Sequence, residues 1–308
     1  MLKRYHFPFS AMGSECNLHF YHEGWPSAVT IARLAIAEVK RIEDRYSRYR
    51  EGNLLYGINQ AAHEGKSIAV DEETAMLLTY AEVCFEKSNG FFDITSGILR
   101  KAWNFTSGAL PSQKTIDALL PKIGFNKLAW RPPLLTFSIP GMELDLGGIV
   151  KEYAADRVNA VCAGNNVSCG LVELGGDICI FGPHPGGNPW SINIRNPHHH
   201  ASATETVEIS KGALATSGDY ERCIERDGKR YSHLLNPQTG HPVFGLSSVS
   251  VVANHCMVAG SISTIAMLKG KEGKSWLEKF ARYYLWIDGE GQNGGTLFRE
   301  NEMRVIPS

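Results

Sequence analysis

Four short segments combine glycine with side chains that could do chemistry, each near the end of an apolar run. Ligands usually meet the backbone at such junctions. Each segment by itself also fits an ordinary cap or turn, so no single one identifies a site. The segments are, in chain order, Gly90-Phe91-Phe92-Asp93, Asp145-Leu146-Gly147-Gly148-Ile149-Val150-Lys151, Thr216-Ser217-Gly218-Asp219-Tyr220 and His233-Leu234-Leu235-Asn236-Pro237-Gln238-Thr239-Gly240.

The segment that ends at Lys151 has the features of an anion site. Gly147 and Gly148 follow an expected strand, and Lys151 lies in the first turn of an expected helix. Free N–H groups at a helix start and a nearby ammonium group favour an anion such as a diphosphate. The spacing matches neither G-x-G-x-x-G nor G-x-x-x-x-G-K-[ST], which disfavours a Rossmann or P-loop protein.

The other three segments offer carboxylates, hydroxyl groups and a base. Asp93 follows two aromatic residues, either at the edge of an aromatic wall or simply after a helix cap. The segment that begins at Thr216 would present hydroxyls and a carboxylate in a turn. His233 lies where a strand is expected to meet a turn, which suits a general base, although a lone strand histidine is more often structural.

Apolar periodicity predicts the elements that must position these segments. Two helices are expected to end at glycines, Gly90 and Gly164. The second half of the chain reads as strands with helices laid against them, which favours an α+β domain, possibly of two lobes, over a doubly wound sheet. Helices are expected over 27–46, 72–88, 149–163, 256–269 and 273–281. Strands are expected over 170–174, 178–181, 190–194, 204–209, 247–253 and 283–287.

Composition excludes several classes of protein. The chain has 308 residues with 31 basic and 32 acidic side chains, and the basic ones are dispersed, so no nucleic-acid partner is expected. No run approaches the roughly 20 apolar residues of a membrane helix, so no membrane insertion is expected. The polar N-terminus predicts a cytoplasmic location, or a periplasmic one if a leader was removed. The seven cysteines, without C-x-x-C, predict buried free thiols rather than a zinc site.

Taken in order, these segments resemble one family, the ApbE flavin transferases, which are FAD:protein FMN transferases. The resemblance covers nearly the whole chain. It implies one domain over residues 1–308 with two intimate lobes, mixed or antiparallel sheets flanked by helices, and FAD in a cleft. The matching residues are Ala11-Met12-Gly13-Ser14, Tyr46-Ser47-Arg48-Tyr49, Ile58-Asn59, Gly90-Phe91-Phe92-Asp93-Ile94-Thr95, Leu144-Asp145-Leu146-Gly147-Gly148-Ile149-Val150-Lys151, Leu174-Gly175-Gly176-Asp177, Thr216-Ser217-Gly218-Asp219-Tyr220 and His233 to Gly240.

The resemblance implies an enzyme that moves FMN from FAD onto a Thr or Ser hydroxyl of an acceptor flavoprotein and releases AMP. The acceptor segment would resemble D-x-x-[ST]-G-A-[ST]. Phosphoryl transfer depends on positioning and charge neutralisation, so Mg²⁺ on the diphosphate and Lys151 are expected to contribute most. His233 matches the histidine of the family's H-x-x-D-P segment and is the expected catalytic base.

The family's pattern also implies which residues bind. The expected metal ligands are the backbone carbonyl of Gly148 and the hydroxyl of Thr264. The expected flavin- or FAD-binding residues are Met12, Tyr49, Phe91, Phe92, Asp93, Asp145, Lys151, Thr216, Ser217, Gly218 and Asp219.

Three positions depart from the family's pattern. The metal segment usually reads A-D-A-x-x-T, and here Gly260 replaces the Asp while Thr264 remains. Mg²⁺ is held through few carboxylates, so this change is expected to weaken the metal site unless another carboxylate or the FAD diphosphate compensates. Asn236 replaces a usual Asp in a turn that should persist. Glu152 follows Lys151 where glycine is common, and we expect it to be a surface residue without a role.

Two other functions stay open. If water replaced the acceptor hydroxyl, the protein would be an FAD pyrophosphatase that gives FMN and AMP. If the charges lost at Gly260 and Asn236 were decisive, it would be an FAD-binding protein with impaired catalysis. Self-modification within residues 93–99 is disfavoured, because Ile98 and Leu99 stand where an acceptor segment has small and hydroxyl residues.

Overall fold

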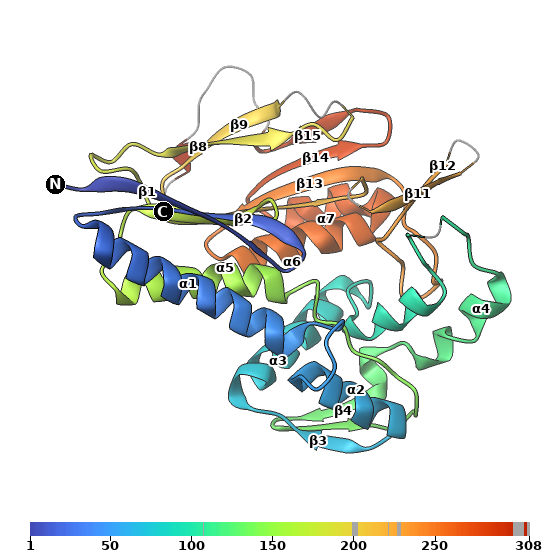
Figure 1. The fold of residues 1–308 in the computed structure, drawn as a ribbon. Coiled ribbons are helices and arrows are strands. Elements are labelled where there is room, and N and C mark those ends of the chain that lie inside the picture. The colour runs from blue at the N-terminus through green and yellow to red at the C-terminus, as the bar shows by residue number, and fades with distance from the viewer. Residues whose placement is uncertain (107, 199–202, 221, 227–228, 298–304, 307–308) are drawn as a thin grey trace.

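A large antiparallel sheet organises the computed structural model, which describes residues 1–106, 108–198, 203–220, 222–226, 229–297 and 305–306 (Figure 1). Every neighbouring pair of strands in this sheet is antiparallel, which confirms an α+β fold over a doubly wound one. In spatial order, its strands are β1 (Lys3–Ala11), β2 (Ser14–His22), β6 (Gly170–Leu174), β7 (Asp177–Gly182), β10 (Gly212–Gly218), β13 (Leu246–Ala253), β14 (Tyr283–Asp288) and β15 (Asn293–Gly295).

Both faces of the large sheet are covered. Helices pack on one face, and a small sheet formed by β8, β9 and β16 packs on the other (Figure 1). Because central strands are buried on both faces, β13 is almost uninterrupted in its burial rather than alternating. The helices are α1 (Trp25–Tyr46), α5 (Val150–Gly164), α6 (Cys256–Leu268) and α7 (Gly273–Phe280). The small sheet has β8 (Trp190–Arg195), β9 (Ala203–Ile209) and β16 (Val305–Ile306).

A second group of elements forms the lower lobe in Figure 1. Its buried residues, such as Ile58 and Leu77, belong to the same apolar cluster as Leu18 of the large sheet, so one core joins the two lobes. The elements are α2 (Leu54–Glu64), β3 (Ser67–Ala69), α3 (Glu72–Ser88), η1 (Ile94–Lys101), α4 (Gln113–Asp117), η2 (Leu120–Lys122), η3 (Phe125–Lys127), β4 (Leu128–Arg131) and β5 (Leu134–Phe137), and the hairpin of β11 (Cys223–Arg226) and β12 (Lys229–Ser232) packs beside them.

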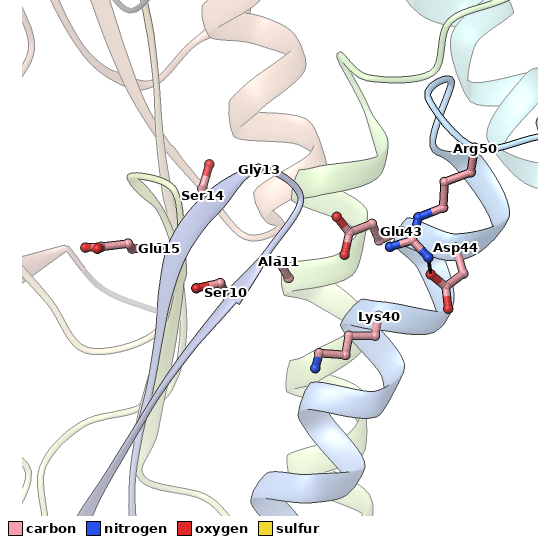
Figure 2. Close-up of a pocket in the computed structure, with 9 residues that line it drawn as sticks. All are labelled: Ser10, Ala11, Gly13, Ser14, Glu15, Lys40, Glu43, Asp44 and Arg50. Carbon is pink, nitrogen blue, oxygen red and sulfur yellow. Dashed lines mark hydrogen bonds and ion pairs between the residues drawn. The ribbon is translucent and has the colours of Figure 1, made fainter.

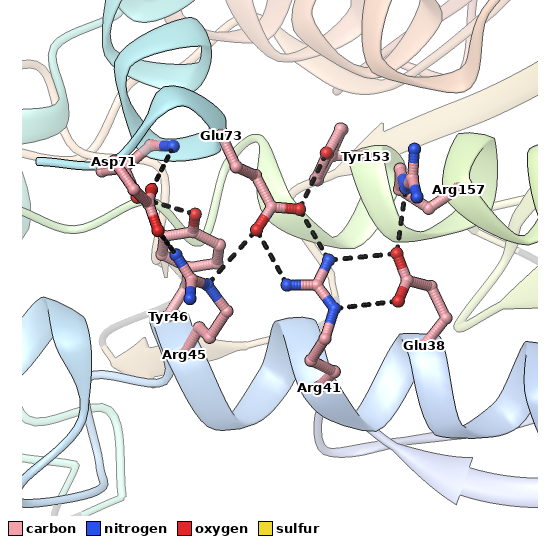
Figure 3. A network of polar contacts seen from close by, with 9 residues as sticks. Glu38, Arg41, Arg45, Tyr46, Asp71, Glu73, Tyr153 and Arg157 are labelled. Atoms are coloured by element: carbon pink, nitrogen blue, oxygen red, sulfur yellow. Dashed lines mark hydrogen bonds and ion pairs between the residues drawn. The ribbon is translucent and has the colours of Figure 1, made fainter.

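A charged network fixes α5 against α1 and α3 (Figure 3). The Arg41 guanidinium donates to Glu38 at 2.8 Å and to Glu73 at 2.6 Å. From α5, Arg157 donates to Glu38 and the Tyr153 hydroxyl donates to Glu73, both at 2.9 Å. The network therefore sets the position of α5, whose first turn carries Lys151 and Glu152.

The predicted helices and strands are confirmed, with ends that shift by one or two residues. The cap after α3 is a correction: Asn89 already adopts the left-handed conformation with φ 59°, and Gly90 follows with φ 79°. Asparagine tolerates this region better than most side chains. The sequence patterns missed β1, β2, α2, β10 and the small sheet of β3, β4 and β5, and none of the described helices has the length and apolarity to cross a membrane.

The network predicts an acid-dependent contribution to stability. Arg41 lowers the pKa of Glu38 from 4.5 to about 2 against the opposing effect of burial, and Arg157 adds to the lowering. The stabilisation is therefore present above pH 4.5 and lost as the pH falls through about 2. We expect Glu38→Gln to lower the free energy of unfolding at pH 7 by about 1 kcal/mol and to flatten its decline in acid, as measured by urea unfolding.

The matched control for this prediction is Glu64→Gln, which removes the fully exposed pair between Glu64 and Lys66. Solvent screens that pair, so its removal should leave the unfolding curves nearly unchanged. Equal pH profiles for wild type and Glu38→Gln would contradict the assigned role of the network.

Candidate functional site

Two tight hairpin turns meet at one end of the large sheet. Met12 and Gly13 join β1 to β2 with φ of 52° and 70°, and Gly175 and Gly176 join β6 to β7 with φ of 56° and 92°. Two-residue hairpins commonly need positive φ at both positions. Because β2 pairs with β6, the turns are neighbours, and a side chain at Gly175 would come 2.7 Å from the Ser14 hydroxyl. Both turns therefore belong to one end of the sheet.

Asp177, the residue after the second turn, links three elements. Its buried carboxylate lies 2.7 Å from the Lys151 ammonium in the first turn of α5. The other carboxylate oxygen accepts a hydrogen bond from the backbone N–H of Thr216 in β10, at 3.1 Å. Lys151 is thus held at the helix N-terminus where the sequence placed it, with Asp177 beside it.

A group of hydroxyls lies between β10 and α6. The Ser217 Oγ is 2.8 Å from the Ser263 Oγ and 2.9 Å from the Thr264 Oγ1. The expectation of a turn at Thr216, Ser217 and Gly218 was wrong: these residues end β10 and pair with β13. Small residues there let α6 pack closely, so the structure brings Ser217 and Thr264 together.

Glu152 is buried, which corrects the expectation of a surface residue. It is 7% exposed, because the first turn of α5 packs against α6. Among the described residues its Oε2 has no hydrogen-bond partner. Burial raises the pKa of Glu152, and the negative charge of Asp177 raises it further. A Cβ atom added to Gly260 would lie 2.5 Å from the Glu152 Cγ and 2.8 Å from its Oε1.

Arg48 connects two of the predicted binding residues. Its guanidinium pairs with the Asp145 carboxylate and donates to the Tyr49 hydroxyl at 2.9 Å. This donation lowers the pKa of Tyr49, whose side chain is otherwise exposed. No strand lies directly before Gly147, contrary to expectation, because residues 138–146 are not in a strand. The side-chain amide of Asn59 instead exchanges two hydrogen bonds with the backbone of Leu144.

The aromatic segment is only partly open. Phe92 is buried beside Gly148, and the Lys269 ammonium lies 4.7 Å from the centre of the Phe91 ring. Asp93 is also buried, and burial raises its pKa. Its carboxylate accepts hydrogen bonds from the chain itself, including the backbone N–H of Phe125 at 3.1 Å. Contact between these residues and a flavin stays a prediction.

His233 follows β12 directly, at the predicted junction of strand and turn. Its Nδ1 lies 3.2 Å from the backbone oxygen of Arg222. A carbonyl only accepts, so Nδ1 carries the proton and Nε2 is unprotonated in the neutral ring. Burial lowers the pKa of His233, and the positive charges of Arg222, Arg48 and Lys151 lower it further, although the Arg222 hydrogen bond opposes them.

Asn236 and Asp219 are the remaining residues that the sequence placed in turns. The Asn236 side chain accepts from the Gln238 N–H at 2.8 Å, so the predicted turn persists without the usual Asp. Burial raises the pKa of Asp219, which lies 3.5 Å from Arg230.

An open pocket of about 700 Å³ lies between the first hairpin turn and α1 (Figure 2). This size is within the range of ligand sites. Glu43, on its wall, accepts the backbone N–H of Met12 at 2.8 Å. The pocket therefore adjoins the turn but has neither Lys151 nor His233 in its lining, which consists of Ser10, Ala11, Gly13, Ser14, Glu15, Lys40, Glu43, Asp44 and Arg50.

Sequence reasoning missed several residues of this site. Asp177, Arg48 and Ser263 received no role, and Glu152 was expected at the surface although it is buried. The acidic residue after a Gly-Gly turn was a usable signal for Asp177. The burial of Glu152 depends on how α5 meets α6, which no local pattern encodes. In the part of the chain that is described, no three His, Cys, Asp or Glu side chains gather as a metal site.

Comparisons with known proteins give a consistent result. The model of the ApbE family matches residues 12–285. An FAD:protein FMN transferase of Vibrio cholerae is 30% identical over 274 residues, which are 87% of this chain and 82% of that protein. The protein of the same name from Escherichia coli is 33% identical over 239 residues, 73% of this chain and 67% of that one.

Solved structures agree with the sequence matches. The ApbE protein of Thermotoga maritima has a TM-score of 0.87 at 29% identity, covering 95% of this chain and 97% of that chain. The flavin transferase ApbE of Vibrio cholerae has a TM-score of 0.86 at 27% identity, covering 96% and 97%. The resemblance and the fold inferred from the sequence are thereby confirmed.

The surroundings of His233 predict a titration below the ordinary histidine pKa of 6.5. In an NMR pH titration, with the ring signals assigned through His233→Gln, we expect the His233 midpoint to lie below 6.5. Lys151→Met should move it upward, because a positive charge is removed. Lys66→Met removes an exposed charge and should leave it in place; a midpoint above 6.5 in wild type would contradict this reading.

Proposed function

The chain belongs to the ApbE family, and we propose on that premise that it is an FAD:protein FMN transferase that acts on an acceptor hydroxyl and releases AMP. The observation that carries the proposal is His233, with Nδ1 tied to a backbone carbonyl and Nε2 left as the base. Lys151 and Arg48 lie close enough for their charges to lower its pKa, so the ring is neutral and basic at neutral pH.

Three groups of this chain would act in the transfer step. The acceptor hydroxyl attacks the FMN-side phosphorus, the bond from that phosphorus to the AMP-side oxygen breaks, and His233 Nε2 takes the hydroxyl proton. AMP leaves with the bridging oxygen. Lys151 and the N-terminus of α5 stabilise the negative charge of the diphosphate as that bond breaks. We further propose Met12, Tyr49, Phe91, Phe92, Asp93, Asp145 and residues 216–219 as the residues that bind FAD.

Oxygen atoms near the start of α5 and on α6 fit a magnesium ion. Mg²⁺ prefers oxygen ligands, commonly one or two carboxylates together with substrate phosphates. The Thr264 hydroxyl, the Gly148 carbonyl and the unpartnered Oε2 of the buried Glu152 supply hard oxygens near the start of α5 and on α6. When bound, Mg²⁺ would neutralise charge on the diphosphate.

The acceptor and the location are also proposals. We propose a flavoprotein acceptor with a segment similar to D-x-x-[ST]-G-A-[ST], and one functional unit over residues 1–308. All seven cysteines are free, five of them buried, which supports action in a reducing compartment such as the cytoplasm.

FMN transfer is tested by intact mass. The protein, FAD and Mg²⁺ are incubated with an acceptor domain that carries D-x-x-[ST]-G-A-[ST], and AMP is followed in parallel. We expect the acceptor to gain one FMN only with Mg²⁺, and to gain none when its Thr or Ser is replaced by Ala. His233→Gln should lower the rate by about 100-fold or more, the usual contribution of a general base.

The controls separate the alternatives. His63→Gln changes an exposed histidine on α2 and should transfer FMN at the wild-type rate. AMP without a gain of acceptor mass would identify a pyrophosphatase instead. FAD bound tightly with neither product would identify a binding protein, and FMN on this chain itself would identify self-modification.

A further inference from the structure

Glu152 is buried, and one of its carboxylate oxygens lacks a hydrogen-bond partner among the described residues. Its side chain is 93% removed from solvent, since only 7% is exposed, and Oε2 has no hydrogen-bond partner among the described residues. A buried carboxylate without a compensating partner is strongly disfavoured in its charged form. Asp177 relieves this cost only while Glu152 is protonated, because the protonated carboxyl can donate to the Asp177 carboxylate, whereas the charge of Asp177 opposes the charged form of Glu152.

The space beside Glu152 exists because residue 260 is glycine. A Cβ atom there would lie 2.5 Å from the Glu152 Cγ and 2.9 Å from its Cδ, far inside contact distance. Any side chain at 260 and the observed position of Glu152 are therefore mutually exclusive. The space between α5 and α6 beside residue 260 has room for only one side chain. In this protein that side chain is Glu152 of α5.

The groups around Glu152 carry oxygen atoms that a metal ion could bind. The Ser263 hydroxyl donates to the Gly260 carbonyl at 2.9 Å and contacts Ser217, which contacts Thr264. Positions 260 and 264 are one helical turn apart and share a face of α6. The Glu152 carboxylate, which lies against Gly260, is therefore on the side of α6 that carries the Thr264 hydroxyl.

We propose that Glu152 is a carboxylate ligand of the magnesium ion, supplied from α5 at the place that a side chain at position 260 of α6 would otherwise occupy. This inference rests on the proposed function, and it answers the question that Gly260 raised in the sequence. The ion would compensate the buried charge, and Thr264 and the FAD phosphates would complete its oxygen ligands.

The direct test measures metal affinity rather than activity. Mn²⁺ is titrated into the protein with FAD and without acceptor, and free Mn²⁺ is followed by its EPR signal. We expect Glu152→Gln, which keeps the shape of the side chain, to weaken binding by about tenfold or more, since even outer partners of metal ligands cost that much. Glu143→Gln is the matched control, because Glu143 is equally buried but paired with Arg100 and Lys101.

Thermal unfolding separates a ligand from a merely structural acid. Without metal, Glu152→Gln should be at least as stable as wild type, because Gln fills the same space without an acid whose charged form is disfavoured by burial and by Asp177. With FAD and Mg²⁺, wild type should gain stability and the variant should gain much less. A variant that is less stable without metal, yet binds Mn²⁺ as tightly as wild type, would overturn the proposal in favour of a structural role.

Transposing the two side chains gives a second test. Gly260→Asp alone should destabilise the protein, because it overfills the space beside Glu152, and Glu152→Gly alone should lose Mn²⁺ affinity. The double variant E152G/G260D should recover affinity relative to E152G, a coupling that independent sites do not show. A folded double variant that binds no better than E152G would overturn the idea of a shared ligand position.

The outcome is separable from the proposed function. If wild type binds Mn²⁺ through Glu152 but transfers no FMN to any acceptor, the proposed function fails and the ligand assignment stands. If wild type transfers FMN and Glu152→Gln keeps full Mn²⁺ affinity, the assignment fails and the function stands.

Discussion

The site depends on one buried carboxylate, that of Asp177. It receives the Lys151 ammonium at 2.7 Å and the Thr216 N–H at 3.1 Å, and so joins the start of α5 to two strands of the large sheet. A buried acid is stable only when such partners compensate it. The two interactions fix the position of the N-terminus of α5 relative to β10. The hydroxyls of Ser217 and Thr264, and the position of Glu152, follow from that arrangement.

The rest of the molecule makes this junction rigid. The charged network of Glu38, Arg41 and Glu73 fixes α5 from its outer side, while α6 packs on its inner side (Figure 3). The two hairpin turns at the end of the sheet are short, since each connects its strands through only two residues, both with positive φ. Preorganisation of this kind is what phosphoryl transfer requires, since its catalysis consists mainly of positioning and charge stabilisation.

The sequence predicted those regular elements whose signals are local, and it missed β1, β2, α2, β10 and the small sheet of β3, β4 and β5. Apolar periodicity marked α1, α3, α5 and α6, and β-branched runs marked β13 and β14. The sequence patterns failed where polar residues form a strand, as at Thr216, because serine and threonine are common in turns and threonine also favours strands. The burial of Glu152 was also beyond reach, because acidic residues in a first helical turn are usually exposed and helix packing is a tertiary property. His233 and Lys151 were placed correctly at a strand end and a helix start.

The steric exclusion between Gly260 and Glu152 has an evolutionary consequence. A single substitution at 260 overfills their common volume, and loss of the side chain at 152 empties it, so each intermediate is disfavoured by packing alone. The two positions are epistatic: the effect of a residue at one depends on the residue at the other. If metal binding were judged only from the motif at residues 259–264 of α6, this chain would be classified as defective. The space beside Gly260 nevertheless contains a carboxylate, that of Glu152 from α5.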